Sequence, residues 1–249
     1  MFKNPEASHQ HSLQTLNMFY EYDDFMESVG SVIDLGCGSG LDLEWWATRT
    51  VREAPYPALN IRCTGVDVLD RLPIASKYPN MVYQKNNFEE HVYESQGKFD
   101  VLWCHDAFQY CVNPIATLTK WWDVTNDGGM LVLILPQTTT IDRRHLTYTQ
   151  ADGCYYHYSL ASLIHILAVT GWDCRGGFFL KETDDPFLHA VVYKSEHKPM
   201  DPRTTRWYDL MDKHLLPESA ETSIMKYGHL DQRDLVLPWL NKNSIWYGK

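Results

Sequence analysis

The sequence lacks the features that mark membrane-spanning, disulfide-rich and nucleic-acid-binding proteins. No apolar run approaches the length needed to cross a bilayer, and the amino-terminal residues are polar. The six cysteines include no Cys-x-x-Cys pair, and most lie in apolar runs, so we expect reduced thiols and no metal site. No stripe of lysine and arginine is present, and the formal net charge is −10. We therefore expect a cytoplasmic protein without membrane association, and we do not expect nucleic acid as a partner.

The length and the apolar content are sufficient for a large folded core. The chain has 249 residues, of which 44% are hydrophobic and 13% aromatic. This is enough for one large α/β domain, or for one domain with a modest appendage. No internal repeat or low-complexity segment is visible.

The stretch Ser31–Gly40 (SVIDLGCGSG) organises the rest of the chain. Strand-forming residues surround Asp34, glycines follow at positions 36, 38 and 40, and an amphipathic run begins at Leu41. This pattern predicts a buried strand, a tight turn and a helix. Glycine suits such a turn because it tolerates unusual dihedral angles and lets a ligand approach bare backbone.

Two well-known glycine-rich loops do not fit these residues. The dinucleotide-binding fingerprint has glycine or alanine three residues after its second glycine, where this chain has Leu41. The P-loop ends in Gly-Lys-Ser/Thr, which does not occur here. The string that remains, Asp-x-Gly-x-Gly-x-Gly, resembles the first motif of class I S-adenosylmethionine-dependent methyltransferases.

The resemblance covers residues 28–195 and implies both a fold and a cofactor. The fold is α/β: a Rossmann-like, seven-stranded, mostly parallel sheet with helices on both faces and an antiparallel last strand. The cofactor is S-adenosyl-L-methionine. We divide the chain into an N-terminal cap helix at 1–30, a cofactor-binding methyltransferase domain at 31–195 and a C-terminal extension at 196–249, which opens with prolines like a linker.

Periodicity and turn residues predict the remaining elements. Apolar residues at helical spacing predict a helix over 8–28, and in the resembling family such a helix often covers the cofactor. Further helices are expected from Leu41, from 115 to an Asp-Gly-Gly turn at 127–129, and from a Ser159 cap to Gly171. Expected strands lie at 62–68, from 81, around 101–103, at 129–137 and, as an antiparallel pair, at 172–181 and 186–194. Between 137 and 158 the periodicity vanishes, which is typical of a functional loop or a lid.

Residues at the carboxyl ends of the first four strands form the predicted cofactor site. Asp34 stands where a carboxylate can anchor the turn and the cationic tail of a ligand, and Asp67 where a carboxylate can accept two hydrogen bonds from a ribose diol. The resemblance further implies contacts from the third strand's exit to the adenine and from the fourth strand's end to the methionine part. The predicted cofactor-binding residues are Asp34, Gly36, Cys37, Gly38, Gly40, Asp67, Val68, Asn87, Phe88, Cys104 and His105.

Methyl transfer from a sulfonium requires that the acceptor atom be aligned with the methyl carbon, and it requires a general base only for a hydroxyl or a protonated amine. An imidazole suits this role near neutral pH. The catalytic candidates are His105, Asp106 and His145. The residues predicted to bind the acceptor are His11, Arg143, Tyr148 and Tyr158. Gln109 and Tyr110 stand where the resembling family frequently has Glu and His, which puts a histidine mechanism at that position in doubt.

The sequence favours a small-molecule or sugar-bearing (glycan) acceptor, methylated on oxygen or nitrogen. No Asn/Asp-Pro-Pro-Phe/Tyr string follows the fourth strand and no Pro-Cys pair occurs, so the motifs of DNA methyltransferases are missing. Three alternatives stay open: cleavage or another transfer with the same cofactor, a non-catalytic cofactor-binding scaffold, and a nicotinamide-dependent dehydrogenase, which Leu41 disfavours. A homodimer formed through the C-terminal extension also stays open.

Overall fold

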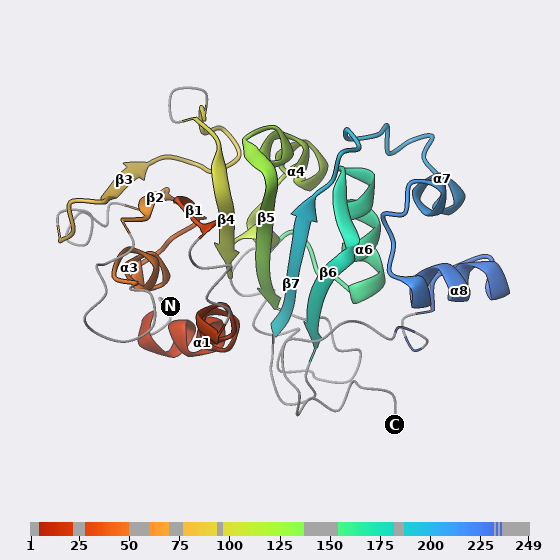
Figure 1. Cartoon of the computed structure of the whole chain (residues 1–249), viewed down its shortest axis with the longest axis horizontal. Helices are drawn as coiled ribbons and strands as arrows, with labels where there is room; N and C mark the ends of the chain where they lie inside the picture. The colour runs from red at the N-terminus through yellow and green to blue at the C-terminus, as the bar shows by residue number, and fades with distance from the viewer. Residues whose placement is uncertain are drawn as a thin grey trace.

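Seven strands form one sheet in the order β3-β2-β1-β4-β5-β7-β6 (Figure 1). The computed structural model of the chain describes residues 5–21, 28–49, 60–69, 77–93, 97–136, 154–181, 187–231, 233 and 235. The strands are β1 (Ser31–Leu35), β2 (Arg62–Asp67), β3 (Met81–Lys85), β4 (Phe99–His105), β5 (Thr125–Pro136), β6 (Trp172–Lys181) and β7 (Phe187–Lys194). Paired neighbours are parallel, except that β7 is antiparallel to both β5 and β6. The predicted sheet and its reversed closing pair are confirmed.

Helices cover both faces of this sheet. They are α1 (Pro5–Glu21), α3 (Leu41–Ala47), the 3-10 turn η2 (Phe108–Tyr110), α4 (Pro114–Asp123), α6 (Leu160–Val169), α7 (Trp207–Asp212) and α8 (Glu218–Tyr227). Figure 1 shows α1 and α3 near the carboxyl ends of the parallel strands, and α7 and α8 beyond α6. None of the helices in the described ranges is long and apolar enough to cross a bilayer.

Side chains that alternate along the central strands divide the core into two layers. On β5, Val132 and Ile134 pack in the cluster that contains α1 and α3, whereas Leu131 and Leu133 pack in the cluster that contains α4 and α6. Because helices cover both faces, the second half of β5 is buried without interruption.

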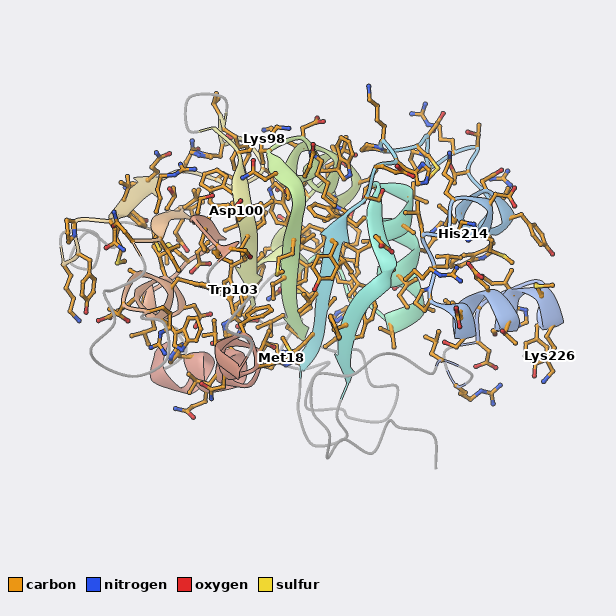
Figure 2. The ribbon with its side chains drawn as sticks, viewed as in Figure 1. Met18, Lys98, Asp100, Trp103, His214 and Lys226 are labelled. Atoms are coloured by element: carbon orange, nitrogen blue, oxygen red, sulfur yellow. The ribbon has the colours of Figure 1, made fainter. Side chains whose placement is uncertain are left out.

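An aromatic cluster fixes α1 and α3 to the sheet beside its carboxyl end. Trp46 of α3 and Trp103 of β4 are fully buried, with ring centroids 6.0 Å apart, and Phe19 of α1 lies 5.8 Å from the Trp46 ring. Figure 2 shows Trp103 on the part of β4 nearer α1, where Met18 is also labelled. Large buried side chains thus hold α1 and α3 beside the carboxyl ends of the strands.

Two predicted boundaries differ from the structure. Helix α1 begins at Pro5, three residues before the predicted start at residue 8, and the fixed φ of proline suits a first helical position. The prediction extended this helix to residue 28, but residues 22–27 lie outside the described ranges. The helix before β5 ends at Asp123 and does not reach the Asp-Gly-Gly turn.

The Asp-Gly-Gly turn instead lies inside β5, where the prediction placed the end of a helix. Phe99 pairs with Thr125 and Val101 already pairs with Met130, so the residues between bulge out of the ladder. Gly128 has a φ of 78°, which the bulge requires and which favours glycine. The predicted turn is present, but the residues on both sides of it pair with β4, so the turn is a bulge within a strand and not the end of a helix.

Residues that follow β7 join the main core. Leu210, Leu215 and Ile224 are buried in the same cluster as α6, and Arg175 of β6 pairs with glutamates at positions 218 and 221. Figure 2 shows His214 and Lys226 on this side of the molecule, far from α1. The described part of the C-terminal extension therefore packs on the α6 side of the sheet.

Replacement of Trp46 with alanine tests the anchoring of α3. We expect Trp46→Ala to lower the free energy of unfolding by about 3–5 kcal/mol, because a fully buried indole leaves a cavity in the aromatic cluster. Urea denaturation measures the change. Met225→Ala, at a side chain that is 73% exposed, is the control and should change stability by less than about 0.5 kcal/mol. Equal effects of the two substitutions would contradict the packing.

Candidate active site

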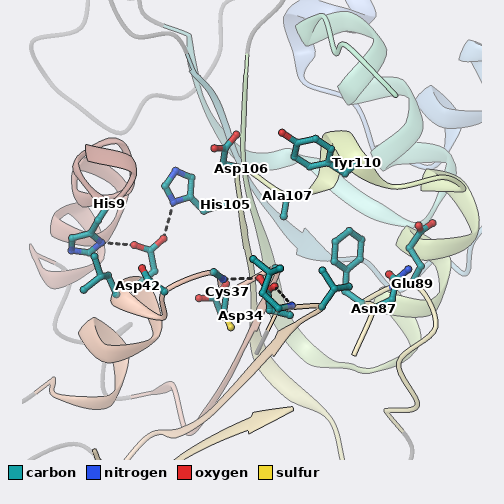
Figure 3. A pocket seen from close by; sticks show the side chains of 18 of the residues that line it. His9, Asp34, Cys37, Asp42, Asn87, Glu89, His105, Asp106, Ala107 and Tyr110 are labelled. Atoms are coloured by element: carbon teal, nitrogen blue, oxygen red, sulfur yellow. Dashed lines mark hydrogen bonds and ion pairs between the residues drawn. The ribbon is translucent and has the colours of Figure 1, made fainter. Parts of the chain in front are cut away.

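A cavity of about 530 Å³ opens at the carboxyl ends of β1, β2 and β4 (Figure 3). Its wall comes from the turn after β1 and the first turn of α3, the ends of β2 and β4, the exit from β3, and η2 with the turn before α4. One residue of α1 and one of the segment before α6 complete it. Ligands of open parallel sheets bind at this edge, at the point where the strand order reverses, which here lies between β1 and β4. The residues that line it are His9, Asp34, Gly36, Cys37, Gly38, Ser39, Leu41, Asp42, Asp67, Val68, Leu69, Asn87, Phe88, Glu89, His105, Asp106, Ala107, Tyr110, Val112 and Tyr155.

The glycine turn forms a floor of bare backbone. The amides of Gly36 and Cys37 donate to the Val66 carbonyl at 2.8 and 3.2 Å, which holds the turn against β2. Gly36 has a φ of 83°, and a Cβ added there would lie 2.3 Å from the Cβ of Ala107. Only glycine satisfies both the dihedral angle and the close approach of the β4 exit.

Asp67 ties the turn to the end of β2. One of its carboxylate oxygens accepts a hydrogen bond from the Gly38 amide and the other from the Leu69 amide, both at 2.8 Å. A carboxylate oxygen has two lone pairs, so each oxygen retains acceptor capacity toward the cavity. This arrangement can bind a vicinal diol while it supports the loop.

The exit from β3 provides the other end of the cavity. Asn87 lines it and accepts a hydrogen bond from the Glu89 amide through its side-chain oxygen at 2.9 Å. Phe88 packs against Trp121 with ring centroids 5.7 Å apart. The Glu89 carboxylate accepts hydrogen bonds from the amides of Val112 and Asn113, both at 2.9 Å, and so joins this exit to the turn before α4.

Asp34 is a buried carboxylate below the glycine turn. Its side chain is 2% exposed. Burial raises the pKa of Asp34 well above its usual value, and the negative charges of Asp42 and Asp67 raise it further. A cationic ligand beside Asp34 would offset both effects, so the site favours a positively charged group at this point.

Asp42 accepts four hydrogen bonds in the first turn of α3. Its Oδ1 accepts from His9 Nδ1 and, at 2.6 Å, from Ser12 Oγ, both on α1. Its Oδ2 accepts from Trp103 Nε1 and His105 Nδ1 of β4, both at 2.9 Å. Figure 3 shows the two imidazoles on opposite sides of the carboxylate.

These donors keep Asp42 ionised. Burial alone would raise the pKa of Asp42, but the positive charge that His105 has when it is protonated and the hydrogen bond from that ring, with the hydrogen bonds of His9 and Ser12, hold this pKa well below its usual range. An ionised carboxylate only accepts, so Nδ1 of His105 carries the hydrogen. Nε2 of His105 is buried, has no hydrogen-bond partner within the described ranges and belongs to a ring on the cavity wall. This nitrogen is therefore a buried polar atom whose hydrogen-bonding capacity the described residues do not use.

Asp106 follows directly and is held in an unusual conformation. It has a φ of 53°, rare for a residue other than glycine, and its carboxylate accepts a hydrogen bond from Gln109 Nε2 at 2.8 Å. Backbone strain of this kind gathers at functional sites. Tyr155 and Val112, 65% and 63% exposed, complete an apolar rim on this side of the cavity.

Most of the predicted site residues gather here. Those that line the cavity are Asp34, Gly36, Cys37, Gly38, Asp67, Val68, Asn87, Phe88, His105 and Asp106. Three described residues are elsewhere: Gly40 is the N-cap of α3, Cys104 is fully buried in the core, and Tyr158 is buried with its ring stacked on Phe108. The structure gives those three packing or capping roles, and their direct contact with a ligand stays a prediction. Arg143, His145 and Tyr148 lie outside the described residues, as does the side chain of His11.

The sequence analysis did not include Asp42 or Glu89 among the site residues. A signal for Asp42 was present, because it shares one helix face with Trp45 and Trp46, and a carboxylate on an apolar face needs partners. His9 could not be distinguished from His11, since both lie on the same polar stretch of α1.

A sequence model described as a methyltransferase domain matches residues 13–175 of the chain. The chain belongs to this methyltransferase family. The family predicted from the glycine motif, class I S-adenosylmethionine-dependent methyltransferases, is thereby confirmed, and S-adenosylmethionine is the cofactor of that family.

Individual relatives are distant. The chain is 27% identical over 146 residues to a ubiquinone biosynthesis O-methyltransferase of Dechloromonas aromatica, a match that covers 58% of this chain and 59% of that protein. It spans about half the length of the curated relatives it matches.

Solved structures share the fold at low sequence identity. The plantazolicin methyltransferase BpumL, in complex with a pentazolic desmethyl analogue and S-adenosylhomocysteine, has a TM-score of 0.55 at 15% identity, over 78% of this chain and 87% of that one. The N-methyltransferase NodS of Bradyrhizobium japonicum, in complex with S-adenosylhomocysteine, has a TM-score of 0.53 at 14% identity, over 78% and 90%.

The described residues fit the methyltransferase cofactor. The Gly36 position has no room for a side chain, the Asp67 carboxylate has acceptor capacity for a ribose, and the buried Asp34 favours a cation. These three features sit in one cavity large enough for a nucleoside with an amino-acid tail.

Substitution of Gly36 with alanine tests the floor of the cavity. We expect Gly36→Ala to abolish binding of S-adenosylhomocysteine in calorimetry, because the added Cβ collides with Ala107 and displaces the turn. Gly228→Ala is the matched control: its φ is 74°, but a Cβ there meets nothing within 4 Å, and it lies far from the cavity. That variant should lose about 1 kcal/mol of stability and bind normally. Normal binding by Gly36→Ala would contradict the assignment.

Asp34→Asn separates stability from binding. The pKa of Asp34 is higher in the folded protein than in the unfolded chain, so protonation of Asp34 stabilises the fold. The free energy of unfolding therefore falls as the pH rises from the ordinary pKa of 3.8 through the pKa of the folded protein. We expect the uncharged Asn variant to be more stable than the wild type at pH 8 and similar to it near pH 4, in urea denaturation at both pH values. The same variant should bind S-adenosylmethionine at least about tenfold more weakly, because a charge-assisted contact is lost. A variant that is destabilised at pH 8 would contradict the buried charge.

Proposed function

We propose that this protein transfers a methyl group from S-adenosylmethionine to a hydroxyl group of a small-molecule or sugar-bearing acceptor. The observation that carries the proposal is the buried Nε2 of His105, which has no hydrogen-bond partner among the described residues. It belongs to a ring on the wall of the cofactor cavity whose Nδ1 is bound to an ionised carboxylate. A hydroxyl oxygen is a poor nucleophile until its proton is removed, and this imidazole is arranged to remove it. The similarity to an O-methyltransferase of ubiquinone biosynthesis supports transfer to oxygen.

The cofactor-binding half of the cavity orients the donor. We assign the ribose diol to Asp67, the adenine to Asn87 and Phe88, and the cationic amino-acid end to Asp34. When bound there, S-adenosylmethionine supplies an electrophilic methyl group on a leaving group that is already positively charged.

The other half of the cavity binds the acceptor and removes its proton. The acceptor O–H would donate a hydrogen bond to Nε2 of His105, and this nitrogen would take the proton. Bound S-adenosylmethionine would supply the methyl group: its carbon–sulfur bond would break as the carbon–oxygen bond forms, and S-adenosylhomocysteine would leave. Asp42 holds the ring in the required tautomer through the 2.9 Å bond and stabilises the imidazolium that forms. Helix α1 and the ring of Phe187, whose centroid is 5.7 Å from that of His105, limit the access of water.

Tyr110, Val112 and Tyr155 complete this half and favour an acceptor with an apolar or aromatic body. The Asp106 carboxylate, held by the hydrogen bond from Gln109 Nε2, lies on this wall as a polar group beside the acceptor. His11, Arg143, His145 and Tyr148 stay predicted contributors to the acceptor site. The division at 30 and 195 and a homodimer stay predictions as well.

His105→Asn tests the base. The Asn amide keeps a donor near the position of Nδ1 but has no counterpart of Nε2, so we expect kcat to fall by about 10²–10⁴-fold. Release of S-adenosylhomocysteine, measured with a panel of phenols, sugars and amines, identifies an acceptor and supplies the rate. Binding of S-adenosylhomocysteine should still be detected by calorimetry. His157→Asn, at an exposed histidine outside the cavity wall, is the matched control.

The panel also separates the competing functions. Cleavage of the cofactor would give products other than S-adenosylhomocysteine, and a scaffold would bind the cofactor without turnover. Full activity of His105→Asn on a hydroxyl acceptor would contradict the proposal.

A further inference from the structure

Glu89 connects the exit from β3 to the turn before α4. Its Oε2 accepts a hydrogen bond from the Val112 amide and its Oε1 from the Asn113 amide, both at 2.9 Å, and the Cys111 thiol donates to Oε1 at 3.1 Å. Figure 3 shows Glu89 at the opposite end of the cavity from His9. Partial burial raises the pKa of Glu89, but these donors lower it below its usual value, so the carboxylate is ionised and only accepts. Each of its oxygens is therefore engaged by the chain itself.

The segment that Glu89 holds continues into the acceptor rim, which we define as Val112, Tyr155 and Tyr156. The Tyr156 hydroxyl donates to the Val112 carbonyl at 3.2 Å. The amides of Tyr155 and Tyr156 donate to the Gln109 carbonyl at 3.0 and 3.2 Å. Val112 and Tyr155 line the cavity. Hydrogen bonds thus join the turn before α4 and the segment before α6 into one side of the cavity mouth.

Burial contributes little to the position of this rim. The exposed fraction is 63% for Val112, 65% for Tyr155 and 39% for Tyr156. Residues as exposed as these make few buried apolar contacts, so their polar contacts decide where they lie. The two amide bonds to Glu89 are charge-assisted and therefore stronger than the neutral hydrogen bonds within the rim.

We propose that Glu89 is a positioning residue that determines which acceptors bind: it fixes Val112, and through Val112 the two tyrosines, as an apolar surface for the body of the acceptor. The proposal rests on the proposed function, which places the acceptor in this half of the cavity. Without a fixed rim, a long apolar acceptor loses more affinity than a compact one, because only the long acceptor reaches the rim. Other contacts hold the glycine turn and His105, so the reacting geometry stays intact.

Glu89→Gln tests the first step of this proposal without an acceptor. The two side chains have the same shape, but the amide nitrogen of glutamine cannot accept a hydrogen bond from a backbone amide. In the full chain saturated with S-adenosylhomocysteine, we expect hydrogen exchange of the Val112 and Asn113 amides to be about tenfold faster. The amides of Tyr155 and Tyr156 should exchange at least about threefold faster, because their support is loosened at one step removed.

Glu90→Gln is the matched control. It is the same substitution at the next residue, which is exposed and lies outside the cavity wall. It should leave the exchange of all four amides unchanged. Wild-type exchange at these amides in Glu89→Gln would overturn the proposal.

Two phenols that differ only in their apolar body test the effect on acceptor binding. Para-hexylphenol and para-cresol present the same hydroxyl group, and calorimetry measures their affinity for the protein saturated with S-adenosylhomocysteine. We expect the wild type and Glu90→Gln to bind para-hexylphenol at least about tenfold more tightly than para-cresol. In Glu89→Gln this preference should fall below about threefold, while the affinity for S-adenosylhomocysteine changes by less than about twofold.

Three other results of the phenol experiment would also overturn the proposal. They are an unchanged preference in Glu89→Gln, a wild type that binds both phenols equally, and a wild type that binds neither. A weaker affinity of Glu89→Gln for S-adenosylhomocysteine with unchanged amide exchange would assign Glu89 to the cofactor instead. Tyr156→Phe keeps the ring but loses the bond to Val112, and it should also lower the preference. If Glu89→Gln does not fold, an unchanged preference in Tyr156→Phe overturns the proposal.

The result is distinguishable from a failure of the proposed function. If exchange and phenol binding follow the expectation but His105→Asn methylates a hydroxyl acceptor at full rate, the role of Glu89 stands and the assignment of the base is wrong. If His105→Asn loses activity but Glu89→Gln keeps wild-type exchange and preference, only the role of Glu89 is wrong.

Discussion

Backbone hydrogen bonds from the glycine turn to Val66 fix the geometry on which the rest of the cavity depends. They place the turn against β2, and from there Gly36 contacts the β4 exit so closely that no side chain fits between them. The Gly38 amide then orients Asp67 at 2.8 Å. Helix α3 begins from the same turn, with Gly40 as its N-cap, and this sets the position of Asp42. These two backbone hydrogen bonds therefore position the floor and two of the carboxylates of the wall.

Three buried carboxylates at this edge have different partners and different chemical roles. Asp67 accepts two backbone amides and supports the loop. Burial and two negative neighbours raise the pKa of Asp34, so it is suited to a cation that arrives with a ligand. The side-chain donors of Asp42 come from two other elements, and they hold it ionised before any ligand binds. The contrast between Asp34 and Asp42 shows how neighbouring charges and hydrogen-bond donors, rather than burial alone, set the pKa of a carboxyl group.

The sequence predicted the sheet, the glycine turn and most of the cofactor side because these depend on local patterns. Apolar strands, glycines at alternate positions and an acidic residue at the end of β2 are readable in order along the chain. The role of Asp42 could not be predicted in this way, because its hydrogen-bond donors at positions 9, 12, 103 and 105 come together only after the sheet is formed. The bulge in β5 was missed for a similar reason: strand pairing with β4 continues past a turn that would end a helix.

The cavity's division into a cofactor half and an acceptor half is most directly tested by a crystal structure of the complex with S-adenosylhomocysteine. We predict that the ribose hydroxyls lie within hydrogen-bond distance of Asp67, that the adenine lies beside Phe88, and that the sulfur faces the side of the cavity that contains His105. A ligand bound at another place, or a sulfur directed away from His105 with the imidazole shielded from it, would contradict the account.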